Sequence, residues 1–165
     1  MITAEQQRSW AETLMSHPDA DKSGQGPGWL VAARKAARQA VAELPVLDRK
    51  QEAWRYTSIE ALLKHRFRPA LNTDNLPVLD INDCLLPDFD TYRLVFANGR
   101  YDPHLSSIKD LPRGVSLGSL RTALVTDPER LATWFGHSAN HSAHVFTAMN
   151  TALVNDGVFV HVESQ

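Results

Sequence analysis

The sequence predicts an α+β fold in which N-terminal helices precede a small mixed α/β unit. Three observations support this prediction. Apolar residues recur at three- and four-residue steps over 29–44, which indicates a helix. Asn98 and Gly99 separate two apolar runs and are typical of a β-hairpin turn. Valine occupies every second position from Val158 to Val162, which indicates a strand with one apolar face.

The composition is ordinary for a soluble globular protein and argues against several classes. Hydrophobic residues make up 43% of the 165 residues and charged residues 22%. The net charge of −2 gives no general attraction to a polyanion, so we expect no nucleic-acid partner. A single cysteine, Cys84, excludes an internal disulfide and is expected to be buried. No apolar run approaches the ~20 residues of a membrane span. We expect a cytoplasmic protein with no membrane partner.

The first helix is predicted over 4–16. Thr3 and Gln6 have the spacing of a capping box, in which each side chain bonds the other residue's backbone N–H. Trp10 and Leu14 then form a short apolar stripe. This stripe requires a partner surface.

The second helix begins near Trp29 and ends before Pro45, which cannot continue a helix. Arg34 is expected on its polar face, away from the apolar stripe. The pattern divides the chain into four units. These are a helical pair (1–44), a linker with a short helix (45–68), a mixed α/β unit (69–157) and a final strand segment (158–165).

The linker contains an aromatic pair that we interpret as a structural clamp. Trp54 and Tyr56 alternate along a segment expected to be extended, so both rings would lie on one side and pin the linker to the next domain. Thr57 and Glu60 have capping-box spacing, which predicts a short helix over 58–65. The clamp is a structural role, with no chemistry of its own.

The hairpin is the strongest strand signal. Asn98 and Gly99 suit a type I′ turn, because both positions then take a positive φ. Pro103 is expected to end the second strand early, since proline cannot donate a ladder hydrogen bond. After the hairpin we expect a strand over 114–117 and helices near 120–124, 128–135 and 146–153.

Three histidines form a candidate metal site: His137, His141 and His144. In a helix their imidazoles would fall within an arc of about 60°, and neutral imidazole is a good zinc ligand. Against this, Gly136 and its Ser, Ala and Asn neighbours are poor helix starters, and no acidic residue nearby would orient the rings. We favour a polar loop and assign no metal or catalytic residue.

Other chemistry is weakly supported. The sequence contains no nucleophile elbow and no G-x-x-x-x-G-K-[ST] phosphate loop. An RNA-binding domain would use Trp54, Tyr56 and the basic residues of 49–68, although acidic residues dilute that charge. The RNA-binding domain and a small histidine metal module remain the alternatives to a structural role.

Three segments resemble the N-terminal region of SufD-like proteins, in the SufB/SufD family of the SUF iron–sulfur cluster assembly system. PVLDRKQEAWRYTS (45–58) is similar to the family pattern P…R…E-x-W-[RK]-Y-T-[PS]. RLVFANGRY (93–101) is similar to R-L-V-F-x-[ND]-G-x-[YF], and FTAMNTALVNDGVFVHV (146–162) to F-x-x-[LM]-N-x-A…D-G-x-x-[IV]-x-V. The segments occur in family order. The equivalent SufB region does not carry W-[RK]-Y-T.

The resemblance implies a scaffold fragment that is not an enzyme. It implies SufB-like and SufC-like partners, bound through parts of the protein beyond this chain. An iron–sulfur cluster would be associated with the full complex, and no cofactor is expected in this fragment. Residues 158–165 would begin a truncated right-handed parallel β-helix, which the preceding region would cap.

Overall fold

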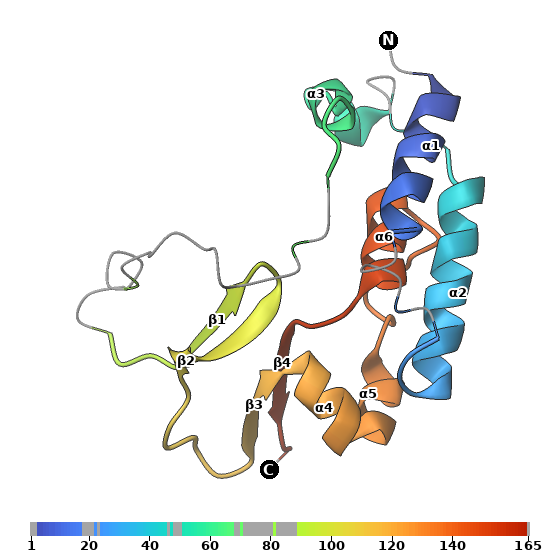
Figure 1. Cartoon of the computed structure of the whole chain (residues 1–165). Coiled ribbons are helices and arrows are strands. Elements are labelled where there is room, and N and C mark those ends of the chain that lie inside the picture. The colour runs from blue at the N-terminus through green and yellow to red at the C-terminus, as the bar shows by residue number, and fades with distance from the viewer. Residues whose placement is uncertain are drawn as a thin grey trace. The chain divides into compact units, whose positions relative to one another are not determined.

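The computed structural model describes residues 3–17, 22, 24–45, 47, 51–67, 70, 81 and 89–164. The chain folds into two compact units, whose elements are labelled in Figure 1. Unit 1 comprises Met1–Pro69 and Glu129–Val154, and unit 2 comprises Ala70–Pro128 and Asn155–Gln165. The mixed unit expected over 69–157 is therefore divided, because its residues 129–154 fold with the N-terminal helices.

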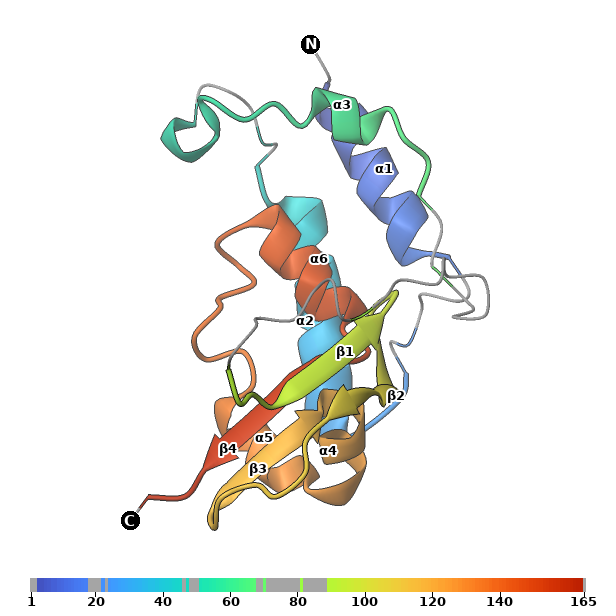
Figure 2. The same ribbon diagram turned by 90° about the vertical axis from the view of Figure 1, so that its left-hand side faces the viewer.

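Unit 1 is organised around three helices: α1 (Ala4–Met15), α2 (Gly28–Glu43) and α6 (Val145–Leu153). Helix α6 packs along α2, and α1 contacts both (Figure 2). The predictions of helices over 4–16, 29–44 and 146–153 are confirmed within a residue or two. The smaller elements associated with this unit are η1 (Glu52–Trp54), α3 (Glu60–Leu63) and α5 (Pro128–Trp134).

Local signals set the ends of the first two helices. Thr3 Oγ1 accepts from the Gln6 amide at 3.2 Å, and Gln6 Oε1 accepts from the Thr3 amide at 2.9 Å. This capping box was predicted and is confirmed. Leu44 is extended, with ψ at 147°, as expected of a residue that precedes proline. Helix α2 therefore ends at Glu43.

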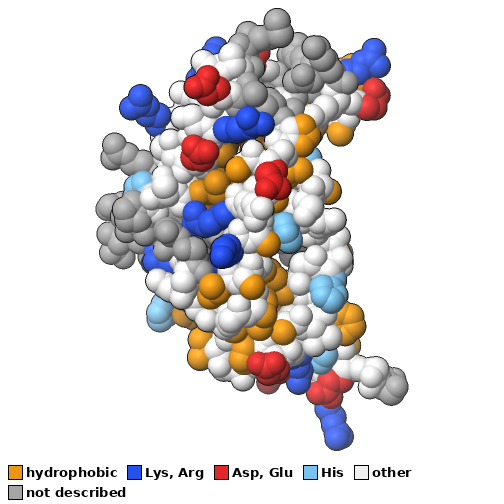
Figure 3. Space-filling view, turned by 90° about the vertical axis from the view of Figure 1, so that its right-hand side faces the viewer, with side chains coloured by type: hydrophobic (Ala, Val, Ile, Leu, Met, Phe, Trp, Pro, Cys, Tyr) orange, Lys and Arg blue, Asp and Glu red, His pale blue; other side chains and the backbone are white. Residues whose placement is uncertain are grey.

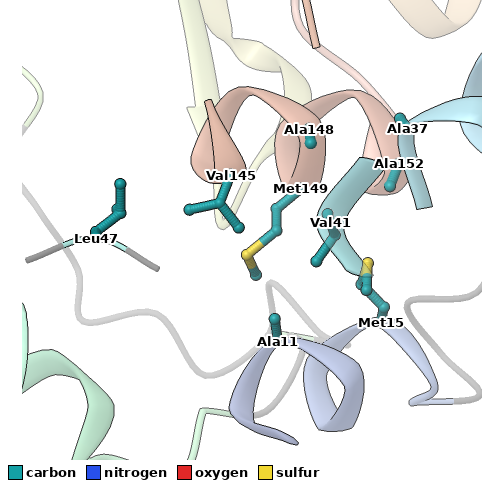
Figure 4. Packing of buried hydrophobic residues seen from close by; sticks show 9 residues of the cluster. All are labelled: Ala11, Met15, Ala37, Val41, Leu47, Val145, Ala148, Met149 and Ala152. Atoms are coloured by element: carbon teal, nitrogen blue, oxygen red, sulfur yellow. The ribbon is translucent and has the colours of Figure 1, made fainter. Parts of the chain in front are cut away.

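The core of unit 1 lies between α1, α2 and α6. Figure 4 shows Met149 of α6 pointing toward Ala11 of α1, with Val41 of α2 beside it. Small side chains let the helix backbones approach closely, so little space remains for added atoms. The buried cluster consists of Ala11, Met15, Ala37, Val41, Leu47, Val145, Ala148, Met149 and Ala152.

Unit 2 contains a hairpin of β1 (Arg93–Ala97) and β2 (Arg100–Ser107). Asn98 and Gly99 have φ values of 50° and 74°. Two positive values match the predicted type I′ turn, whose twist suits paired strands. The predicted hairpin and its turn residues are confirmed.

The prediction that Pro103 ends the second strand is wrong. Strand β2 continues through Pro103, and the register shifts where Val95 faces Asp102 but Arg93 faces Ser107. The extra β2 residues form an irregular stretch in which proline has no ladder bond to donate. In the same stretch the Ser106 hydroxyl accepts from the Val95 amide at 2.9 Å, so this β1 amide bonds a side chain of β2.

The second sheet of unit 2 pairs β3 (Val115–Ser119) with β4 (Val158–Val162), and α4 (Leu120–Thr126) follows β3 directly. The predicted final strand is confirmed. It pairs antiparallel with β3, from Val158 opposite Ser119 to Val162 opposite Val115. Among the described residues the sheets are two-stranded and antiparallel, and no parallel β-helix coil is formed. No helix in the described ranges is both long and apolar enough to cross a bilayer.

We expect Ala148→Leu to destabilise unit 1 by about 1–3 kcal/mol, because Ala148 is fully buried where α6 meets α2. Denaturant unfolding followed by tryptophan fluorescence measures this change. Ala36→Leu, on the exposed face of α2, is the matched control and should shift stability by less than about 0.5 kcal/mol. Equal effects at both positions would contradict the tight helix contact.

Candidate functional site

Trp54 joins the linker to the N-terminus of α6. Its ring is half-buried and packs against the core cluster. The indole Nε1–H donates to His144 Nε2 at 3.0 Å. The two rings also lie nearly parallel, with centroids 5.2 Å apart and planes inclined by 23°. This half of the proposed clamp holds the segment around η1 against α6.

Tyr56 does not share this role. Its side chain is 87% exposed, and the guanidinium of Arg55 lies 5.4 Å from its ring centroid. The predicted pairing of both rings on one side is therefore wrong. The physical reason is local, because residues 52–54 form a turn of 3₁₀ helix and the segment is not extended. Side chains two apart on such a turn do not share a face.

The predicted cap of the short helix is also corrected. Helix α3 begins at Glu60 with Ile59 in the capping position, so Thr57 is not the N-cap. The Ser58 hydroxyl accepts from the Glu60 amide at 3.3 Å. The helix spans only four residues, shorter than the predicted 58–65.

The histidines do not assemble into a metal site. Residues 136–144 form turns, in which Gly136 has a φ of 77° and Asn140 Oδ1 accepts from the Ser142 amide. His137 is exposed, whereas His144 is the N-cap of α6. No metal-binding group of three His, Cys, Asp or Glu side chains exists among the residues that the structure describes. The alternative of a small metal module at His137, His141 and His144, which the sequence analysis did not favour, gains no support from this arrangement.

His144 instead faces two N–H donors. Its Nδ1 lies 3.2 Å from the Phe146 amide, and its Nε2 lies 3.0 Å from the Trp54 indole nitrogen. A neutral imidazole carries one hydrogen and accepts at one nitrogen only. Each tautomer therefore bonds either the helix N-terminus or the linker tryptophan. His144 therefore has a structural role, which sequence reasoning did not find because it weighed His144 only as a metal candidate.

Arg34 is buried, with only 4% of its surface exposed, although it was expected on the polar face of α2. Its guanidinium donates to the carbonyls of Lys22, Gln25 and Val154, at 2.8, 2.5 and 2.6 Å. Burial lowers the pKa of Arg34, and the nearby charge of Arg38 adds to this. The spacing of the residues could have predicted this burial. Arg34 continues the helical stripe of the buried residues Leu30, Ala37 and Val41.

Asp156 is the corresponding hub of unit 2. Its Oδ1 accepts from the Ser119 hydroxyl at 2.7 Å and from the amides of Arg121 and Gly157, while Oδ2 accepts from the Tyr101 amide. Burial raises the pKa of this carboxyl, but the four hydrogen bonds outweigh it and leave the pKa below its usual value. One carboxylate thus joins β2, β3, α4 and the entry to β4.

Several residues weighed from the sequence lie outside the described ranges, namely Cys84, Arg49, Lys50 and Arg68. On the face shown in Figure 3, the coloured acidic and basic side chains are interspersed. RNA binding would use a dense basic groove, and that face shows none. It therefore gives the RNA-binding alternative no support.

Residues 21–165 match the family model described as the SufBD protein N-terminal region. The chain belongs to the SufBD family. It is also 29% identical over 140 residues to a Synechocystis sp. protein named as an iron–sulfur cluster assembly SufBD family protein. That match covers 85% of this chain and 30% of the relative, so the chain spans less than a third of the relative's length. Helix α1 precedes the part of the chain that the SufBD model matches.

We expect His144→Ala to lower the stability of unit 1 by about 1–2 kcal/mol, because it removes the acceptor that either caps α6 or bonds Trp54, together with the ring that stacks on Trp54. Denaturant unfolding measures this loss. His137→Ala is the matched control, and its exposed side chain should contribute less than about 0.5 kcal/mol. An unchanged stability of the His144→Ala variant would show that the contacts of His144 do not stabilise unit 1.

We expect Asp156→Asn to destabilise unit 2 by roughly 1–2 kcal/mol at neutral pH, since an amide nitrogen or a lost acceptor would face the Tyr101 amide. Because folding lowers the pKa of Asp156, its contribution is complete above the ordinary aspartate pKa of about 3.9 and declines as the pH falls below it. As the pH falls through this acid range, the Tm of the parent protein should therefore decrease more steeply than the Tm of the variant. Parallel curves would exclude this linkage.

Proposed function

We propose that the chain is the N-terminal part of a SufD-like scaffold subunit that takes part in iron–sulfur cluster assembly. Membership of the SufBD family supports the general role. The Synechocystis relative, named as an iron–sulfur cluster assembly SufBD family protein, agrees with it. The W-R-Y-T sequence at Trp54 to Thr57 supports SufD rather than SufB. The cluster would be cargo of the assembled complex and not a resident cofactor of this chain.

The observation that carries the structural side of the proposal is the apolar face of β4. Val158, Val160 and Val162 are exposed by 57%, 58% and 65%. They lie on one face with their β3 partners, because directly opposed residues in an antiparallel pair share a face. A two-stranded sheet is only marginally stable alone. A row of exposed valines on it favours contact with another apolar surface.

We attribute this face to contact with the following part of a longer protein. A solenoid's first coil exposes apolar surface and strand edges, and an N-terminal unit that covers them prevents unwanted pairing. The proposed role is therefore to cap the start of the β-helix and to hold the subunit in position. This role needs no catalytic residue, so we propose that the chain is not an enzyme.

The proposed partners are SufB-like and SufC-like subunits in a cytoplasmic complex. They would bind through the parts of the subunit that follow this chain, and the N-terminal part would stabilise those regions indirectly. Neither a membrane nor a nucleic acid is required for this role.

The test replaces Val158, Val160 and Val162 together by threonine in the full-length protein. Threonine keeps the branched shape but places hydroxyl groups in the proposed contact, so we expect a Tm lower by several degrees and less co-purified SufB-like subunit. Val125→Thr is the control, since Val125 is 80% exposed on α4. A triple variant that behaves like this control would exclude the capping role.

A further inference from the structure

The contacts that His144 makes with Trp54 and with the start of α6 depend on the charge of its ring. Its Nε2 lies 3.0 Å from the Trp54 indole nitrogen, and its Nδ1 lies 3.2 Å from the Phe146 amide nitrogen. Both neighbours are N–H donors, so each requires a lone pair on the imidazole. The neutral ring has one such lone pair, and the protonated ring has none. A proton gained by His144 therefore removes its last acceptor.

The position of His144 at the start of a helix adds a second effect of the same sign. His144 is the N-cap of α6, and the first turn of this helix carries no acidic side chain. The N-terminal end of a helix carries a partial positive charge. A protonated His144 is therefore repelled by the same helix end that the neutral ring can cap.

No carboxylate takes part in the described side-chain contacts of His144, which are hydrogen bonds and ring contacts with Trp54 and Phe146. Helix α6 contains no charged residue. The titratable and charged residues of the turns before α6 and of the segment around η1 are His137, His141, Glu52 and Arg55. Among the contacts that the structure describes, a proton on His144 therefore has no anionic partner.

The segment around η1 is attached to the helices through the Trp54 side chain. Helix η1 has no buried residue, and the Trp54 amide donates locally, to the Gln51 carbonyl at 2.9 Å. The Trp54 ring, by contrast, packs against the buried cluster and against Phe146, with ring centroids 5.8 Å apart. If this ring stayed in place beside a protonated His144, its indole N–H would face another N–H. Moving the ring into water gives the indole N–H an acceptor.

We propose that His144 makes the attachment of this segment pH-dependent. The neutral ring holds Trp54 against α6, and the protonated ring releases Trp54 together with residues 52–54. Attraction between a cationic imidazole and an indole opposes release, but it is ordinarily weaker than the cost of two N–H donors left without an acceptor. Histidine side chains ordinarily change charge between about pH 5 and 8, so release occurs as the pH falls through this range.

The release is local, because the core of unit 1 does not titrate in this range. The buried cluster between α1, α2 and α6 consists of alanine, valine, leucine and methionine side chains. These helices therefore stay packed while Trp54 leaves. The inference rests on contacts within unit 1 and does not depend on the proposed scaffold role.

The test is fluorine NMR of the full-length protein labelled with fluorotryptophan. The Trp54 signal is the one that is missing from the Trp54→Phe variant. We expect the ratio of released to bound Trp54 to rise at least about tenfold between about pH 7.5 and pH 5, and to fall again when the pH is raised. The signals of Trp10 and Trp29 should keep their positions, which reports that the helices remain packed.

The decisive variant is His144→Gln, whose amide oxygen accepts a hydrogen bond at every pH and does not titrate. Its Trp54 signal should not respond to pH, and His144→Asn serves the same purpose if the glutamine variant does not fold. The matched controls His137→Gln and Glu52→Gln should respond like the parent, since both side chains are exposed.

Three outcomes would overturn the inference. The first is a Trp54 signal of the parent protein that stays unchanged over the whole pH range. The second is a pH response that persists without His144 or is lost in the His137→Gln control. The third is a simultaneous change of all tryptophan signals, which would indicate global unfolding in place of local release.

Discussion

The packing of α6 on α2 is the contact on which the rest of unit 1 depends. It unites segments far apart in the chain, as the bond from Arg34 to Val154 shows across 120 residues. Closing so long a loop costs conformational entropy, which the buried helix contact must repay. The N-terminus of α6 also contacts Trp54 through His144, so the placement of Trp54 depends on this helix.

The elements that the sequence predicted correctly are those specified by neighbouring residues. The capping box of Thr3 and Gln6 acts within one helical turn. The Asn98 and Gly99 turn likewise needs only two positive φ angles. Such signals act over a few residues and do not depend on distant packing, so a reading of the chain can find them.

The side-chain roles that were missed depend on residues far away in the chain. From the sequence, His144 is a candidate metal ligand. In the structure its Nε2 faces the indole N–H of Trp54, which lies ninety positions earlier in the chain. Arg34 is charged, yet its place on the buried stripe is compensated by carbonyls from two separate segments. The prediction that Tyr56 shares a face with Trp54 is wrong for a different reason. It required an extended segment, but residues 52–54 form a short 3₁₀ turn and Tyr56 is exposed.

The chain passes from unit 1 to unit 2 between Val154 and Asn155. The Arg34 guanidinium donates to the Val154 carbonyl just before this point. Just after it, the Asp156 carboxylate accepts hydrogen bonds from four donors. Only Asn155 separates the two anchors. Each unit therefore anchors the chain within one residue of the boundary, so the crossover leaves little freedom to the backbone at either end of Asn155.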